Sequence, residues 1–151
     1  MIYTCGSCNT RNDFSNFLKK YFGVTNIIEF SHNAGMSKDL LFNIKNFNFS
    51  VDDIIISECN PHDSCSNLNE IKKIWDSIVN IFPAKCPGGK IVLINYIRPK
   101  NAEKYTEMEK IRLYKHTLEN GINFINIDFD TNLCKEYLSS DLIHFTYREK
   151  V

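Results

Sequence analysis

The chain has 151 residues and a mass of 17.6 kDa, which is enough for one domain that buries its own hydrophobic core. We therefore expect a single domain over residues 1–151. Basic and acidic side chains both number 18, so the formal net charge is zero. This balance argues against a nucleic-acid or anionic-membrane binder, which would carry an excess of basic residues. A small neutral substrate or a protein partner is favoured instead.

Two further features concern the compartment. No apolar run approaches the ~20 residues of a membrane span, and the N-terminus has neither the basic start nor the small-residue cleavage site of a signal peptide. We expect a cytoplasmic protein that has no membrane partner. Cytoplasmic thiols stay reduced, so each cysteine is interpreted as a core residue, a ligand or a nucleophile. The six cysteines are Cys5, Cys8, Cys59, Cys65, Cys86 and Cys134.

Short apolar segments alternate with segments of helical period, a pattern typical of strands joined by crossover helices. Asp13–Phe22 is predicted to be a helix that stops at Gly23, a residue suited to a left-handed C-cap. The third strand contains a run of three isoleucines, as expected of a strand covered on both faces. In chain order we predict strands at Ile2–Cys5, Val24–Phe30, Asp53–Glu58, Lys90–Ile97 and Asn123–Asp128.

Three more helices are predicted between these strands. Ser37–Phe47 is one, and Ala102–Glu119 is another. Asn67–Phe82 begins with an Asn-x-x-Glu capping box and is expected to end at Pro83. The whole pattern predicts an α/β fold: a three-layer α/β/α sandwich around a five-stranded parallel sheet in the flavodoxin-like order 2-1-3-4-5.

In such a sheet the ligand binds beyond the carboxyl ends of the strands, so the loops at that edge are candidate site loops. Four of them carry short polar blocks. These blocks are Gly6-Ser7-Cys8, Asn33-Ala34-Gly35, Asn60-Pro61-His62-Asp63 and Asp141-Leu142-Ile143-His144.

In this order and at these strand ends, the blocks resemble those of the SGNH (GDSL-type) hydrolase superfamily over nearly the whole chain. The family has Gly-Asp-Ser after the first strand, a Gly after the second, Gly-x-Asn-Asp after the third and Asp-x-x-His near the C-terminus. Two blocks depart from that pattern. Ser7 and Cys8 stand where the family has Asp and the nucleophilic Ser, a form similar to the GSCFA-type branch, and His62 stands where the family has its oxyanion-hole Asn.

The resemblance implies an esterase or acyltransferase that acts on an O-acyl substrate, such as an O-acetyl sugar, without a metal or another cofactor. A thiol at a strand-to-helix turn has a lowered pKa, which favours Cys8 as the nucleophile. His144 would act as its base, and Asp141 would orient the imidazole. Gly35, together with His62 or Asn60, would stabilise the oxyanion, and Ser7 is the neighbouring alternative to the thiol.

Three other interpretations stay open. Cys5-Gly6-Ser7-Cys8 is also a Cys-x-x-Cys motif, as in thioredoxin-like dithiol redox proteins, although that fold needs antiparallel strands. A second alternative is a zinc site formed by Cys5, Cys8, Cys59 and either Cys65 or His62, but the second pair lacks standard spacing. The altered blocks also allow a non-catalytic binding module on the hydrolase fold. Asp63 is either the N-terminal anchor of the third helix or a site group, and a glycine at Gly35 also suits a positive φ.

Overall fold

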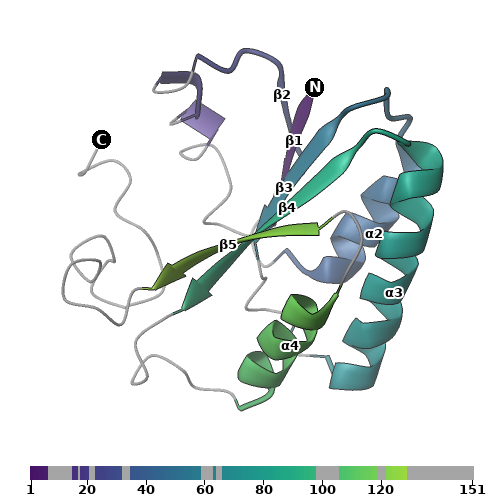
Figure 1. Ribbon diagram of the computed structural model, residues 1–151, viewed down its shortest axis with the longest axis vertical. Helices are drawn as coiled ribbons and strands as arrows, with labels where there is room; N and C mark the ends of the chain where they lie inside the picture. Colours follow the sequence, from purple (N-terminus) through teal and green to yellow (C-terminus); the bar gives the residue numbers. More distant parts are fainter. Residues whose placement is uncertain are drawn as a thin grey trace.

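A computed structural model describes residues 1–6, 15, 16, 18–20, 23–31, 35–58, 63, 66–97, 106–118 and 122–128. Within these residues, strands and helices alternate as the sequence pattern predicts (Figure 1). The elements are β1 (Ile2–Cys5), β2 (Ile27–Glu29), α2 (Ser37–Asn46), β3 (Ile54–Glu58), α3 (Leu68–Lys85), β4 (Lys90–Ile97), α4 (Thr106–Thr117) and β5 (Ile122–Asp128).

The five strands form one sheet in the order β2-β1-β3-β4-β5. Every neighbouring pair is parallel, including the central pair, in which Cys5 of β1 lies opposite Ser57 of β3. The predicted fold class, strand order and strand direction are therefore confirmed. Because β1 and β3 are neighbours, the loops that follow them leave the sheet side by side at its carboxyl edge.

Helices lie on both sides of this sheet. Figure 1 shows α2, α3 and α4 side by side on one face, and α3 packs against both of its neighbours. Residues 15, 16 and 18–20 are helical and lie on the other side, within the segment where the sequence predicts its first helix. Gly23 follows them with φ of +64°, the left-handed conformation expected of a C-cap glycine.

The hydrophobic core joins the sheet to the layer formed by α2, α3 and α4. Tyr3 of β1 stands at one end of it, with ring centroids 5.4, 5.3 and 5.1 Å from those of Phe30, Phe47 and Phe49. Such stacked and edge-to-face contacts add to the gain from burying the rings. The buried core residues are Tyr3, Cys5, Leu40, Ile44, Ile55, Ile71, Trp75, Ile78, Phe82, Cys86, Ile91, Leu93 and Ile111.

The third helix begins as predicted and ends later than predicted. The Asn67 side chain accepts a hydrogen bond from the Glu70 N–H at 2.9 Å, which confirms the N-cap. The expected end at Pro83 is wrong, because α3 continues to Lys85. A proline in the last turn removes only one backbone hydrogen bond, and the N–H that follows the helix still binds the carbonyl of Phe82 at 2.8 Å.

No helix among the described residues is both long enough and apolar enough to cross a bilayer.

Candidate functional site

The carboxyl end of β1 leads directly into the first polar block. Gly6 is buried and has φ of +146°, a backbone conformation that residues with a side chain rarely adopt. A glycine is therefore required where the chain leaves β1. The loop that it opens is the one that carries Ser7 and Cys8.

The second block leads into the first turn of α2. Gly35 is buried next to Met36, which is the N-cap residue of α2. The Met36 N–H donates to the Asp39 carboxylate at 2.8 Å, so the side chain of Asp39 binds back to the start of its own helix. This first turn fixes the direction in which the chain enters α2 just after Gly35.

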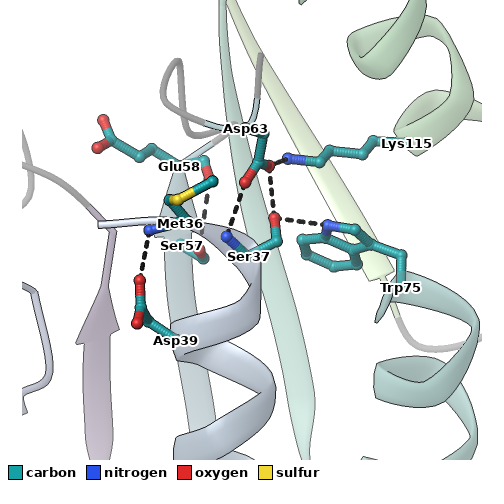
Figure 2. Close-up of polar contacts among 8 residues, drawn as sticks. All are labelled: Met36, Ser37, Asp39, Ser57, Glu58, Asp63, Trp75 and Lys115. Carbon is teal, nitrogen blue, oxygen red and sulfur yellow. Dashed lines mark hydrogen bonds and ion pairs between the residues drawn. The ribbon is translucent and has the colours of Figure 1, made fainter. Parts of the chain in front are cut away.

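The third block is tied to the second by Asp63. The Ser37 N–H donates to Asp63 Oδ1 at 2.8 Å, and the Ser37 hydroxyl donates to Asp63 Oδ2 at 2.5 Å. Both residues are completely buried. These two hydrogen bonds join positions 26 residues apart in the chain (Figure 2). They therefore hold Asp63, the last residue of the third block, against the start of α2, two residues after Gly35.

Two further side chains complete this arrangement. Lys115 of α4 donates to Asp63 Oδ2 at 2.6 Å, and neither side chain of this ion pair is exposed to any appreciable extent. The Trp75 indole N–H of α3 donates to the Ser37 hydroxyl at 2.8 Å, and Lys115 Nζ lies 5.2 Å from the centroid of the indole ring. We call these four residues, Ser37, Asp63, Trp75 and Lys115, the Asp63 cluster.

The position of Asp63 in the sequence suggested two roles, an anchor for the start of the third helix or a site group. The structure does not support the first of these roles. Asp63 does not cap α3, because Asn67 does so. Its carboxylate instead binds the first turn of α2 and a lysine of α4. No sequence pattern singles out Lys115, since lysines on helices are almost always exposed.

A second buried carboxylate lies at the end of β3. Glu58 is the last residue of that strand and has no exposed surface. Figure 2 shows its side chain pointing away from Asp63 and Lys115, so that it lies on the other side of β3. Glu58 was missed at the sequence level. Its one distinguishing mark is that a charged residue stands at the end of a strand that begins with three isoleucines.

Cys5, the first cysteine of the Cys-x-x-Cys motif, is the last residue of β1 and is 2% exposed. Burial raises the pKa of its thiol to about 12, and the nearby Asp39 carboxylate contributes in the same direction. A thiol of this kind stays protonated at neutral pH. The first cysteine of a dithiol redox motif needs the opposite property, an accessible thiol with a lowered pKa.

Of the predicted site residues, Gly35 is the one that the structure describes. Ser7, Cys8, Asn60, His62, Asp141 and His144 lie outside the described residues, and their roles stay predictions. Among the described residues, no group of three or more His, Cys, Asp and Glu side chains is placed to hold a metal ion.

A parallel sheet in this order, with helices on both faces, defines a doubly wound α/β/α domain. Solved structures share this fold. A candidate platelet activating factor from Streptococcus pneumonia matches with a TM-score of 0.71 and 19% identity, over 98% of this chain and 77% of that one. A carbohydrate esterase of family 3 from Talaromyces cellulolyticus matches with a TM-score of 0.61 and 11% identity, over 97% and 88% of the two chains.

A third structure, described as a possible lipase from Chitinophaga pinensis DSM 2588, matches with a TM-score of 0.51 and 13% identity. The match covers 88% of this chain and 69% of that chain. At these identities the likeness is one of fold. No protein-family model matches the chain, and no curated protein matches its sequence.

Proposed function

We propose that the protein is an SGNH-like esterase or acyltransferase with a cysteine nucleophile. In this proposal Cys8 attacks the acyl carbonyl, His144 takes and returns the proton, and Asp141 orients the imidazole. Gly35 stabilises the oxyanion through its backbone N–H, together with a side chain of the third block. That side chain belongs to His62 or Asn60.

The pair of hydrogen bonds between Ser37 and Asp63 is the observation that best supports this proposal. It ties the turn after Gly35 to the loop that carries Asn60 and His62. An oxyanion hole made of donors from two loops needs such a tie, because each donor works only within a few tenths of an ångström of its place. The turn that begins at Gly6 leaves the same edge of the sheet, from the strand next to β3.

The proposed reaction has two steps. The Cys8 thiolate forms a C–S bond to the acyl carbon, the carbonyl oxygen becomes an oxyanion, and collapse of this intermediate expels the alcohol, which takes a proton from protonated His144. The thioester then passes its acyl group to water or to another acceptor, whose proton returns to His144. A single oxyanion donor typically lowers the barrier by about 3 kcal/mol, so the His62 or Asn60 side chain would contribute substantially.

The substrate that we propose is a small-molecule or carbohydrate acyl ester, with an acetyl group on a sugar as the first candidate. Two observations support this choice. The chain shares its fold with a carbohydrate esterase, and its balanced charge does not favour a polyanionic ligand. We place the reaction in the cytoplasm, where a cysteine nucleophile stays reduced.

The dithiol redox interpretation has less support than the acyl-transfer proposal. The sheet is parallel throughout, whereas a thioredoxin-like fold contains antiparallel strands. In addition, Cys5 is buried and its pKa is raised to about 12, which leaves this thiol unsuited to open a disulfide exchange.

The experiment is to trap the acyl intermediate. The protein is mixed with an activated acetyl ester, quenched in acid and mapped by peptide mass spectrometry. We expect an acetyl group on Cys8 and no adduct in the variant Cys8→Ala. Ser7→Ala is the matched control and keeps the adduct. An adduct on Ser7 would make the enzyme a serine esterase, and the absence of acylation at both residues would favour the non-catalytic binding module.

A further inference from the structure

The Asp63 cluster places a charged lysine where lysines are rarely found. Lys115 lies on α4 with no exposed surface, and its ammonium group contacts the Asp63 carboxylate and the Trp75 ring. Most lysines extend along the surface so that the ammonium group reaches water. The fold therefore holds this charge inside the protein, at the point where α2, α3 and α4 converge on the loop that follows β3.

A gain in stability is a weak explanation for such a pair. Removing two charges from water costs more than their attraction returns unless the geometry is favourable, and apolar residues of similar volume often replace buried ion pairs without loss. A better explanation for a buried ion pair is that it selects one arrangement of the chain over others. Here Asp63 accepts three hydrogen bonds, from the Ser37 N–H, the Ser37 hydroxyl and Lys115.

The cluster also fixes the direction of each donor. The Ser37 hydroxyl has one proton, which it donates to Asp63, and it accepts the Trp75 indole N–H with its oxygen. Lys115 binds the same Asp63 oxygen from α4. A movement of Asp63 would therefore break its contacts to α2 and α4 at once, while α3 is joined to the cluster through the Trp75–Ser37 hydrogen bond (Figure 2).

We propose that Lys115 is a positioning residue for the oxyanion side of the site: by holding Asp63 against Ser37, it fixes the position of residue 63, which follows β3, relative to the start of α2. The term oxyanion rests on the proposed function. The positioning itself rests on the described contacts. Lys115 acts through Asp63 and does not touch the substrate.

The test compares three variants of the full chain. Lys115→Met removes the charge, and the double variant Asp63→Asn with Lys115→Met replaces the ion pair by a neutral pair. Lys85→Met is the matched control, because Lys85 also binds α2 from another helix. Its ammonium group donates to the carbonyls of Ile44 and Lys45, at the opposite end of α2 from Ser37.

The first readout is amide hydrogen exchange by NMR. We expect the Ser37 N–H, which donates to Asp63, to exchange about tenfold faster or more in both variants that lack Lys115, because the side chain at position 63 loses its buried partner on α4. The Ile91 amide of β4 serves as the internal reference for the sheet. The indole N–H signal of Trp75, the single tryptophan of the chain, should move as well, whereas Lys85→Met should change neither signal.

The second readout is turnover of an activated acetyl ester. We expect kcat to fall about a hundredfold for both variants that lack Lys115, because a shift of about 1 Å in a catalytic arrangement has an effect of that size. KM should stay within about twofold, since Lys115 does not contact substrate, and Lys85→Met should leave both constants unchanged.

The outcomes are separable. Wild-type exchange at Ser37 in the double variant, or faster exchange spread equally over Ile91 and the sheet, would overturn the positioning role. If Lys115→Met does not fold, the neutral double variant decides by the same two signals. If the wild-type protein is never acylated, the proposed function is wrong. The exchange data would still show whether Lys115 holds Asp63 against Ser37.

Discussion

Trp75 and Ser37 connect α3 to α2 through one buried hydrogen bond, in which the indole N–H donates to the serine hydroxyl at 2.8 Å. Both side chains are fully buried, and the Ser37 hydroxyl is also bound to Asp63. A buried donor that loses its acceptor destabilises the folded state by its full desolvation free energy, because no hydrogen bond compensates for the one it made with water. The Ser37 hydroxyl therefore contributes both to the stability of the fold and to the position of Asp63 at the carboxyl edge of the sheet.

Ser37→Ala should therefore lower the free energy of unfolding by about 2 kcal/mol, because Trp75 loses its acceptor and Asp63 loses one donor. Urea unfolding measures this change, and the indole N–H signal of Trp75 should shift upfield. Ser77→Ala is the control. The Ser77 hydroxyl is exposed on α3 and donates only to the carbonyl of Lys73, so its loss should change stability by no more than about 0.5 kcal/mol.

The two cysteines of the Cys-x-x-Cys motif should differ in reactivity. At pH 8 a thiol with a pKa of about 12 is ionised in about one molecule in ten thousand, so Cys5 should resist alkylation in the folded protein. Cys8 should react faster than an unperturbed thiol and titrate below ~8.5. Quantitative mass spectrometry of the alkylated peptides at several pH values checks both statements, and a disulfide between Cys5 and Cys8 as the main air-oxidised species would contradict them.

The same pKa shift has a consequence for stability. Cys5 keeps its proton in the folded state up to a pH of about 12, whereas the thiol of the unfolded chain ionises near its ordinary value of 9.0. This contribution to stability is therefore complete below pH 9 and declines as the pH rises towards 12. Urea unfolding at pH 8 and pH 10 should show the decline, and it should become smaller in Cys5→Ala.

Substitutions at His144 and Asp141 test the proposed triad. His144→Ala should slow acylation by orders of magnitude, because the thiol loses its base. Asp141→Asn should slow it by a similar or smaller factor, since the imidazole can then adopt the wrong tautomer. Stopped-flow release of the leaving group from an activated acetyl ester measures both rates. If neither substitution changes any measured activity, the catalytic hypothesis fails.

The cap of α3 offers a test of the fold that is independent of the site. Asn67→Ala should lower the free energy of unfolding by about 1 kcal/mol, because the Glu70 N–H loses the oxygen that it binds at 2.9 Å. Asn69→Ala, two residues further on and exposed, is the matched control and should leave stability nearly unchanged. Equal losses in the two variants would show that the cap contributes nothing.

The sequence predicted the sheet well where strands are buried on both faces. The bounds of β1 and β4 match the prediction. β4 contains the continuous apolar run Ile91-Val92-Leu93-Ile94, a pattern typical of strands covered on both faces. Val24–Phe30 was predicted as the second strand, yet β2 spans only Ile27–Glu29. This strand lies at the edge of the sheet and pairs only with β1, so the short β1 limits how many of its residues can be hydrogen-bonded.

The candidate site was harder to predict, because its described contacts join residues that are distant in the chain. Gly6 stands out as a glycine directly after a strand and Gly35 as one just before a helix, and the third block drew attention to Asp63. The partner of Asp63 could not be predicted. Lys115 lies 52 residues further along the chain, and its burial depends on how α4 packs rather than on any local pattern.

The order β2-β1-β3 also bears on how the chain folds during synthesis. β1 is made before the other four strands but is an inner strand of the sheet, and its second neighbour, β3, begins only at Ile54. Until that residue has left the ribosome, one edge of β1 is unpaired and Tyr3 and Cys5 cannot be fully covered. The chain that leaves β1 at Gly6 therefore gains its second neighbouring strand only after residues 54–58 have been translated.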